Sequence, residues 1–430
     1  MWWPLLGEAV IVQLVKLQLL IVTTSEAISF GCRNTLISDE WRNAVLNYHN
    51  TIRRTVAQGL QATGGGAKKF MPKAGKMYEL NWDCDIENNA FLSTCDQTTV
   101  PIPAAYAANS GTFKMSGQKC NVKDNTMAVL KNWYDQATAV DLSGGAVYND
   151  QKQKEFGIMV FGETTGFACS YSKCGSDGKL LCLYNKQAPQ NAGNLYDTPT
   201  ADICDKCPQD APCTAWICKP NKYTLDTNAN PQPKCTNAGD DGMTYDMQMT
   251  ARDMANYYRS LDATGWAQDK NGYAPTAKAM NALNYDCDDA GKNAKTEAAK
   301  CTATSYTPSA GYVLNSYKTN DYTLPREEVL KQAMSSWFGQ LKNVDLDEKA
   351  LYNGDVQTGA KDFANLVFGT ATKVGCAVNT CLREGFQVAI CQFDSTAVAP
   401  DDPLYTVGKT CSGCAAAGKT CHKGLLGICA

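Results

Sequence analysis

Apolar residues recur at helical spacing in two stretches near the start of the chain. The first stretch consists of Trp41, Val45, Tyr48, Ile52 and Val56. Ser38 precedes it as a residue that can cap a helix, and Gly59 follows it as a residue that can end one. The second stretch consists of Met127, Leu130, Trp133 and Ala137. Both patterns predict helices that pack one apolar face on a core.

The periodicity changes further along the chain. Three short runs there are rich in aromatic and aliphatic residues: Phe156 to Phe161, Phe167 to Tyr171 and Leu180 to Tyr184. We expect each run to be a strand. Helices early and strands late in one stretch of chain predict an α+β domain in which helices cover a sheet.

The same pattern then occurs a second time. The second set of helical positions is Met247, Ala251, Met254, Tyr258 and Leu261, followed by Leu330, Met334, Trp337 and Leu341 behind Pro325. The matching expected strands are Phe363 to Phe368, Val374 to Val378 and Phe386 to Phe393. Ten cysteines of the first half match ten of the second in order, with offsets of 203 to 211 residues. We infer that the chain is one domain used twice.

Cysteine usage points to an oxidising compartment, because the chain contains 21 Cys and only 2 His. The matched cysteines are Cys32, Cys84, Cys95, Cys169, Cys174, Cys182, Cys204, Cys207, Cys213 and Cys218, then Cys235, Cys287, Cys301, Cys376, Cys381, Cys391, Cys411, Cys414, Cys421 and Cys429. An even set in each half predicts disulfides, although the pairing cannot be read from the sequence. Cys120 has no counterpart, which leaves a buried or capped thiol and an intermolecular disulfide as alternatives.

Two cysteine-dense stretches, from Cys204 to Cys218 and from Cys411 to Cys429, follow the expected strands of each half. Their spacing is similar to that of structural zinc ligands, but oxidised pairs are the usual outcome in a secreted chain. Both interpretations stay open, with disulfides favoured. Small disulfide-bonded modules also present rigid loops, so a protease-inhibiting or channel-blocking role through these stretches is a further hypothesis.

The ends and the middle of the chain suggest five segments. Residues 1–27 are expected to be a secretory signal, because Lys16 precedes a short apolar stretch and Ala27 offers a cleavage site. We expect a first domain over residues 28–203, a cysteine-rich hinge over 204–234, a second domain over 235–400 and a cysteine-rich tail over 401–430. The apolar runs are too short or too interrupted to span a membrane, so a secreted, extracellular protein is predicted.

The charge of the chain limits its partners. The net charge is −3 and the pI is near 5.6, so no broad basic surface is available to neutralise phosphates. Nucleic acid is therefore not an expected partner.

Several motifs resemble those of one known family. They are Tyr48 to Arg54, Phe156 to Cys169 and Leu180 to Asn185 in the first half, and Asn256, Arg259 and Phe363 to Cys376 in the second. Together with the cysteine order, they resemble the CAP superfamily of cysteine-rich secretory proteins from about Cys32 to Cys429. The tandem layout is similar to the activation-associated secreted, or venom-allergen-like, proteins of parasitic nematodes. The resemblance implies two tandem αβα sandwiches, each with a central cleft and a signature strand.

In many relatives that cleft holds two His and two acidic residues, which can bind a divalent metal such as zinc. Here Glu155 and Asp362 take the place of the histidine at the start of the signature strand, and Gln136 and Gln340 take the place of the helix acid. The other two positions fall near Thr99 and Ala108 in the first half, and near Ser305 and Leu314 in the second. The resemblance therefore implies degenerate clefts, with no metal, no cofactor and no catalytic residue.

The two histidines offer no alternative chemistry. His49 belongs to the early helix motif and is expected to be a structural, hydrogen-bonded residue, and His422 lies in the cysteine-dense tail. A nucleophilic triad or dyad would need one of them as its base. Each cleft is also expected to hold a single replaced acid, whereas carboxylate pairs work at separations of about 5 to 10 Å.

The leading hypothesis is a secreted, non-enzymatic interaction protein that acts on a host protein or receptor, as the resemblance implies. The alternative is carriage of a small apolar ligand such as a sterol or fatty acid, with Met247, Met254 and Tyr258 as candidate groove residues. A metal-assisted or serine hydrolase ranks third, because it would need a histidine-poor cleft to hold a metal or a base.

Overall fold

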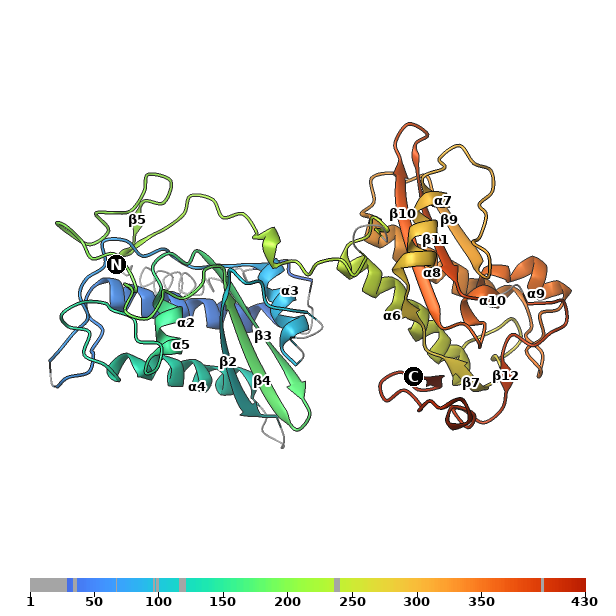
Figure 1. Ribbon diagram of the computed structural model, residues 1–430, viewed down its shortest axis with the longest axis horizontal. Helices are drawn as coiled ribbons and strands as arrows, with labels where there is room; N and C mark the ends of the chain where they lie inside the picture. The colour runs from blue at the N-terminus through green and yellow to red at the C-terminus, as the bar shows by residue number, and fades with distance from the viewer. Residues whose placement is uncertain are drawn as a thin grey trace, which may run out of the picture. The chain divides into compact units, whose positions relative to one another are not determined.

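The computed structural model describes residues 29–33, 37–66, 68–95, 97, 100–115, 121–235, 240–395 and 398–430. The expected signal segment 1–27, Thr99 and Cys120 lie outside these ranges. The chain divides into two compact units, the first ending at Pro231 and the second beginning at Gln232 (Figure 1). Within the described ranges, no helix is both long enough and apolar enough to cross a membrane.

The first unit is a four-stranded sheet covered on both faces by helices. Its helices are α2 (Asp39–Ala57), α3 (Cys84–Ser93), α4 (Val122–Asp135) and α5 (Lys154–Val160), with short 3-10 turns at Gln136–Thr138 and Thr227–Ala229. Its strands are β1 (Asn81–Trp82), β2 (Ala107–Lys114), β3 (Gly166–Cys174) and β4 (Asp177–Tyr184) in the order β1-β3-β4-β2, with a separate hairpin of β5 (Cys213–Thr214) and β6 (Ile217–Cys218). Figure 1 shows α3 on one side of the sheet and α2, α4 and α5 on the other.

The second unit repeats this architecture. Its helices are α6 (Tyr245–Ala263), a π-helical turn (Cys287–Gly291) leading into α7 (Lys292–Ala298), α8 (Arg326–Gly339), α9 (Gly354–Gly359) and α10 (Lys361–Val367), with 3-10 turns at Gln340–Asn343 and Ala415–Ala417. The main sheet has the order β8 (Asn284–Tyr285), β10 (Lys373–Cys381), β11 (Phe386–Phe393) and β9 (Val313–Thr319). A smaller sheet places β7 (Ala277–Asn281) between β12 (Thr406–Val407) and β13 (Ile428–Cys429). The predicted α+β fold with two αβα sandwiches is confirmed.

The first long helix forms where the apolar spacing predicts it. The Ser38 side chain accepts a hydrogen bond from the Trp41 backbone N–H at 3.2 Å, which satisfies one of the free donors at the start of α2. Val45 and Val56 are fully buried in the core beneath the helix. Gly59 follows the helix with a φ of +70°, a conformation that favours glycine.

Two of the expected strands are wrong. Phe156 to Phe161 lies mostly in helix α5, and Phe363 to Phe368 lies mostly in helix α10. Each run is buried except for its last residue, and a short, buried apolar run has no periodicity that could distinguish a helix from a strand. Gly157 allows helix α5 to pack closely on Tyr148, because a Cβ atom at this position would collide with the Tyr148 ring. The signature strand implied by the resemblance therefore begins as a helix.

All twenty matched cysteines form disulfides, and the pairing is the same in the two units. The first unit contains Cys32–Cys84, Cys95–Cys174, Cys169–Cys182, Cys204–Cys213 and Cys207–Cys218. The second contains Cys235–Cys287, Cys301–Cys381, Cys376–Cys391, Cys411–Cys421 and Cys414–Cys429. The cysteine-dense stretches therefore have no thiolate to offer zinc, since the thiolate is the form that binds metal.

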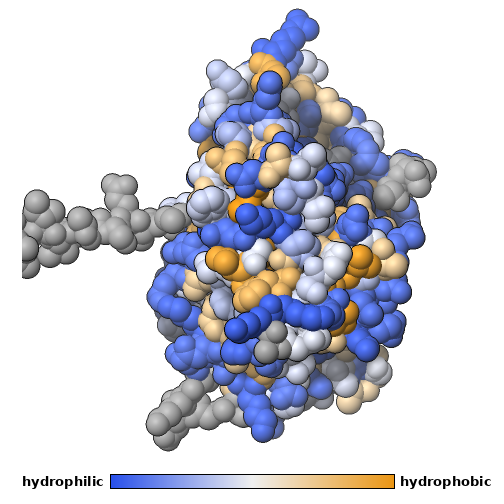
Figure 2. All heavy atoms as spheres, turned by 90° about the vertical axis from the view of Figure 1, so that its left-hand side faces the viewer, coloured by the Kyte–Doolittle hydropathy of each residue, from blue (hydrophilic) through white to orange (hydrophobic). Residues whose placement is uncertain are grey.

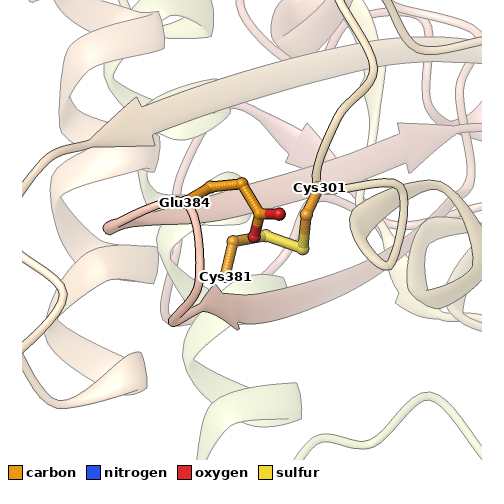
Figure 3. Close-up of side chains that lie close together, drawn as sticks. All are labelled: Cys301, Cys381 and Glu384. Atoms are coloured by element: carbon orange, nitrogen blue, oxygen red, sulfur yellow. A yellow bond between two sulfur atoms is a disulfide. The ribbon is translucent and has the colours of Figure 1, made fainter.

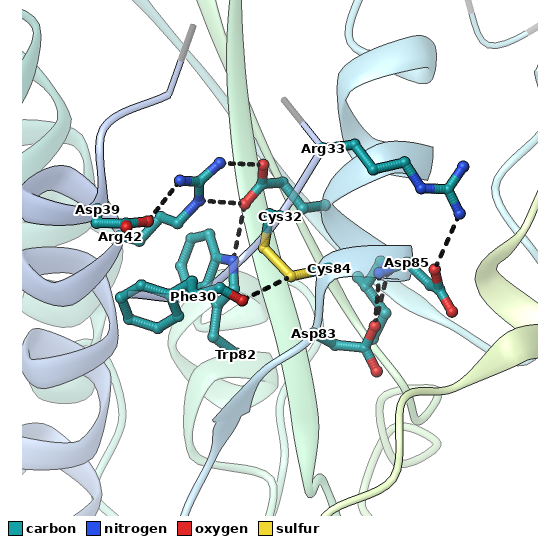
Figure 4. The surroundings of a disulfide bond; sticks show 11 residues. Phe30, Cys32, Arg33, Asp39, Arg42, Trp82, Asp83, Cys84 and Asp85 are labelled. Atoms are coloured by element: carbon teal, nitrogen blue, oxygen red, sulfur yellow. Dashed lines mark hydrogen bonds and ion pairs between the residues drawn. A yellow bond between two sulfur atoms is a disulfide. The ribbon is translucent and has the colours of Figure 1, made fainter. Parts of the chain in front are cut away.

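A buried ion pair fixes α2 beside the first of these disulfides (Figure 4). Nε and Nη2 of Arg42 each donate to one carboxylate oxygen of Glu87 at 2.7 Å. The indole N–H of Trp82 donates to the same carboxylate at 2.8 Å. Arg42 and Glu87 are 4% and 1% exposed, so the bidentate pair is shielded from water and holds α2 against α3.

Candidate functional site

At the position where the family resemblance implies a cleft, the first unit holds a glutamine hydrogen-bonded to an acid. Gln136 follows the C-terminal end of α4, and Glu155 lies in the first turn of α5. Nε2 of Gln136 donates to Oε2 of Glu155 at 2.7 Å. Oε1 of Gln136 accepts from the backbone N–H groups of Glu155 at 3.1 Å and Phe156 at 3.3 Å. One amide therefore binds the carboxylate and also caps the first turn of the helix.

The second unit repeats this arrangement. Nε2 of Gln340 donates to Oδ2 of Asp362 at 2.8 Å. Oε1 of Gln340 accepts from the backbone N–H groups of Asp362 at 2.9 Å and Phe363 at 3.3 Å. The geometry is kept although the acid is one carbon shorter. We call Gln136 with Glu155, and Gln340 with Asp362, the glutamine–acid pairs.

An asparagine from the sheet supports each pair. Nδ2 of Asn109 in β2 donates to the Glu155 carbonyl at 3.0 Å, and Nδ2 of Asn315 in β9 donates to the Asp362 carbonyl at 2.7 Å. Neither asparagine belongs to a motif that can be recognised in the sequence. Their spacing of 206 residues, which lies within the 203 to 211 range of the matched cysteines, is the signal that could have found them.

A tyrosine lies near each acid, and the negative charge of the acid contributes to raising the pKa of the tyrosine. Burial, with a smaller contribution from Asp150 and Glu155, raises the pKa of Tyr148 to about 12. Burial and the charge of Asp362 raise the pKa of Tyr352. Burial also raises the pKa of Asp362, and the hydrogen bond from Gln340 offsets part of that effect. Both tyrosines are therefore neutral at physiological pH and cannot serve as bases there.

The remaining degenerate positions supply no metal ligand. Ala108 in β2 and Leu314 in β9 are apolar and directly precede the two supporting asparagines. Ser305 is exposed in the loop before β9. Zinc prefers three or four Cys, His or carboxylate ligands. Within the described ranges, the donor set of each cleft offers one carboxylate already bound by an amide, so it does not fit the metal that the family resemblance implies.

Neither histidine reaches a glutamine–acid pair. His49 is fully buried in α2, where Nδ1 lies 2.9 Å from the Val45 carbonyl and Nε2 lies 2.9 Å from the Tyr184 hydroxyl. Burial lowers the pKa of His49 to about 4, so its ring is neutral. Nδ1 of His422 accepts from the backbone N–H groups of Gly424 and Leu425 at 3.1 and 2.8 Å. Both histidines have structural hydrogen bonds.

One other group gathers potential ligand atoms. Cys301, Cys381 and Glu384 place their sulfur and carboxylate atoms within 4.8 Å of one another (Figure 3). The two sulfurs form a disulfide, so the group has a single anionic ligand, the Glu384 carboxylate. We therefore do not assign a metal centre to it.

The comparison with known families decides the identity of the fold. Residues 46–184 and 252–393, more than half of the chain, match the CAP family model, described as the cysteine-rich secretory protein family. The chain belongs to the CAP family. The matched stretches include both glutamine–acid pairs, so the family resemblance inferred from the motifs is confirmed.

This CAP protein is similar to nematode secreted proteins along most of its length. It is 29% identical over 408 residues to the Ancylostoma secreted protein of Ancylostoma caninum, covering 91% of this chain and 92% of that protein. The crystal structure of Na-ASP-1 is 26% identical and covers 94% of this chain and 100% of that one, with a TM-score of 0.42. The structure titled NaASP2 with Zn2+ is 25% identical and covers 46% of this chain and 100% of that one, with a TM-score of 0.39.

Proposed function

We propose that this CAP protein is a secreted, non-enzymatic protein that acts by binding an extracellular protein or receptor through its surface. The observation that carries the proposal is the glutamine–acid pair, which occurs with the same hydrogen bonds in both units. A cleft kept for metal or acid-base chemistry would leave its carboxylate accessible to a ligand. In each unit the glutamine amide donates a hydrogen bond to one oxygen of that carboxylate.

Catalysis by carboxylates alone is not favoured either. Asp135, which lies next to Gln136, forms an ion pair with Lys131 at 2.6 Å on an exposed face of α4. A second free acid close to Glu155 would be needed for paired acid-base work. A hydrolase therefore ranks below a binding protein.

Two observations support the proposal that the protein is secreted, and the family resemblance supports a host partner. The ten disulfides are typical of an oxidising compartment. The Ancylostoma relative carries the word secreted in its name. A parasite protein that acts on host tissue or immune cells is what the family resemblance implies. Two units in one chain also permit avidity, if both reach their targets.

No observation favours carriage of an apolar ligand by the candidate groove residues. Met247 is 4% exposed in the core of the second unit, and Met254 and Tyr258 pack against the same core. The Tyr258 ring stacks on Phe338 with centroids 4.4 Å apart. These side chains fill space within the fold.

The test measures binding and turnover with the same mature chain. It is applied to a panel of purified host serum proteins and receptor ectodomains, and separately to peptide and ester substrates. We expect saturable binding to at least one panel protein and no turnover. Turnover that scales with protein concentration and disappears in the Glu155→Ala, Asp362→Ala double variant would contradict the proposal. The Lys131→Ala variant is the control, because it changes a charge near the cleft without touching a glutamine–acid pair.

A further inference from the structure

Large apolar side chains are exposed at three equivalent places in the two units. In the first unit they are Leu60, Phe70 and Trp216, which are 60%, 48% and 53% exposed. In the second unit they are Trp266, Tyr273 and Leu426, which are 72%, 56% and 62% exposed. We call each set of three a helix-end surface, because its segments meet at the C-terminal end of α2 or α6.

The first place is the residue after the glycine that follows the long helix. The backbone N–H of Leu60 donates to the Thr55 carbonyl at 3.1 Å, and that of Trp266 donates to the Leu261 carbonyl at 3.0 Å. The glycine before each residue has a φ of +70° or +76°. The same helix termination therefore turns a large apolar side chain to solvent in both units.

The second place is a short loop that follows the helix. An antiparallel bridge joins Ala62 to Phe70, and another joins Gln268 to Tyr273. The aromatic side chain lies on the returning arm in both loops. It is a Phe in the first unit and a Tyr in the second.

The third place is a hairpin clamped by disulfides. Cys213 pairs with Cys218 across β5 and β6, and both form disulfides with other cysteines of the stretch. The two-residue turn between the strands has positive φ at Ala215 (+48°) and Trp216 (+74°), a conformation that residues with a side chain rarely adopt. In the second unit Cys421 pairs with Cys429, and their loop exposes Leu426. A clamped turn loses little further freedom when a partner binds it.

Contacts bring these segments together at the end of the helix. In the second unit, the Ser260 hydroxyl of α6 donates to the Leu426 carbonyl at 2.5 Å, and the Thr410 hydroxyl donates to the Ala263 carbonyl at 3.4 Å. Figure 1 shows β7, β12 and the C-terminus beside this end of α6. In the first unit, the segment after α2 is bound on one side to Ala57 and on the other to Cys204. Figure 2 views the side on which β5 lies and shows apolar side chains gathered among hydrophilic ones.

Lysines accompany the apolar side chains, although the whole chain has a net charge of −3. The segment from Leu60 to Lys76 contains four lysines and no Asp or Glu. The segment from Leu404 to Ala430 contains three lysines and no Asp or Glu. Lys69 and Lys76 form ion pairs with Asp141 and Glu163. The other segments of the two surfaces contain Asp205, Asp210 and Asp269, so lysines outnumber acids around each surface by a small excess.

We propose that the two helix-end surfaces are docking sites for an acidic protein segment that carries exposed apolar side chains. This assignment rests on the proposed function and names the surface through which it acts. Charge complementarity selects an acidic partner. Rigid Trp, Tyr and Phe anchors are typical of binding hot spots. Each side chain is 48% to 72% exposed, so part of it is covered by its own unit, and a protein partner is favoured over a lipid layer. Two equivalent sites allow one chain to hold two copies of the same segment.

The experiment selects random 12-residue peptides displayed on phage against the full mature chain. The comparison protein is a variant in which all six helix-end residues are replaced by Ser. We expect enriched peptides that combine Asp or Glu with aromatic or aliphatic residues. A synthetic peptide of this kind should bind the six-site variant about tenfold or more weakly than the native chain. Replacing Lys73, Lys409 and Lys423 by Glu should also weaken its binding.

The matched control replaces exposed apolar residues outside the two surfaces. The Tyr322→Ser, Leu382→Ser variant removes side chains that are 51% and 72% exposed and should bind the peptide like the native chain. Unfolding midpoints of all variants report whether the fold is kept. Failure to enrich such peptides, or equal binding by the six-site variant, would overturn the assignment. So would sedimentation of the native chain, but not the six-site variant, with vesicles of phosphatidylcholine and phosphatidylserine, because that result assigns the surfaces to a membrane.

These outcomes are separable from a failure of the proposed function. A host protein from the panel that binds the six-site variant as tightly as the native chain would reject the helix-end surfaces and leave the binding function intact. Absence of binding to every panel protein, together with substrate turnover, would reject the function itself.

Discussion

Nε2 of Gln136 lies 2.7 Å from Oε2 of Glu155 and donates a hydrogen bond to it. The same bond joins Gln340 to Asp362 at 2.8 Å in a unit of different sequence. Because the amide oxygen also caps the helix that carries the acid, the pair has a structural role that does not require a ligand. This role explains how a cleft without histidine can keep its acid.

The glutamine–acid pair should depend on having one amide and one acid. Gln340→Glu places two carboxylates at hydrogen-bond distance, and we expect it to cost about 2 kcal/mol of unfolding free energy at pH 7. The cost should shrink at pH 4, where one carboxyl takes up a proton. Urea unfolding at the two pH values measures the difference. Asp362→Asn is the control and should show the opposite trend, because it removes an acid whose raised pKa costs stability at the higher pH. An equal cost of Gln340→Glu at both pH values would contradict the account.

The buried His49 should make the first unit sensitive to acid. Its pKa is lowered from 6.5 to about 4. Between these two pH values, the unfolded chain therefore binds a proton at His49 and the folded unit does not. Stability should therefore fall as the pH drops from about 6.5 to about 4, by up to about 3 kcal/mol. His49→Gln should remove most of this fall. Hydrogen exchange in α2, compared between the native chain and His49→Gln at each pH, measures it; an equal fall in both chains would contradict the account.

The second unit contains a buried acid that the first lacks. Asp262 of α6 is fully buried, and neither carboxylate oxygen has a hydrogen-bond partner of good geometry within the described part of the chain, although Tyr405 and Arg259 lie close enough to offset part of the effect of burial on its pKa. Burial raises its pKa to about 8, so the folded unit retains a proton that the unfolded chain releases above about pH 4. Stability should fall as the pH rises from about 4 to about 8.

Val56, also fully buried, occupies the equivalent position in α2 and suggests the replacement. Asp262→Val should stabilise the second unit by about 2 kcal/mol at pH 8 and by less at pH 5. Denaturant unfolding at the two pH values checks this. The reciprocal Val56→Asp variant should destabilise the first unit more at pH 8 than at pH 5. A variant Asp262→Val that is less stable than the native chain at pH 8 would show that the carboxyl has an essential partner.

The sequence predicts the repeat and the long helices because their signals are local or periodic. The Ser38 cap and the stripe ending at Val56 need no knowledge of distant residues. The sequence does not predict α3, because the buried face of that helix includes the polar residues Glu87, Asn89 and Ser93 in place of an apolar stripe. Strand β2 is missed for a similar reason, since Asn109 and Ser110 interrupt its apolar alternation.

The candidate site is predictable only in part. The family resemblance places Gln136, Glu155, Gln340 and Asp362 at cleft positions, but nothing local indicates that each glutamine binds its acid. The two partners are 19 residues apart in the first unit and 22 residues apart in the second. They come together only because helices α5 and α10 form in place of the expected strands. The disulfide pairing is another long-range property that the cysteine order leaves open.

Zinc content after equilibrium dialysis tests the central claim most directly. The mature chain is dialysed against micromolar zinc and then against metal-free buffer at pH 7, and the metal retained per chain is measured. The account predicts no stoichiometric zinc, and no difference between the native chain and the Glu155→Ala, Asp362→Ala variant. One or two zinc ions per native chain that are lost in that variant would show that the clefts bind metal and would contradict it.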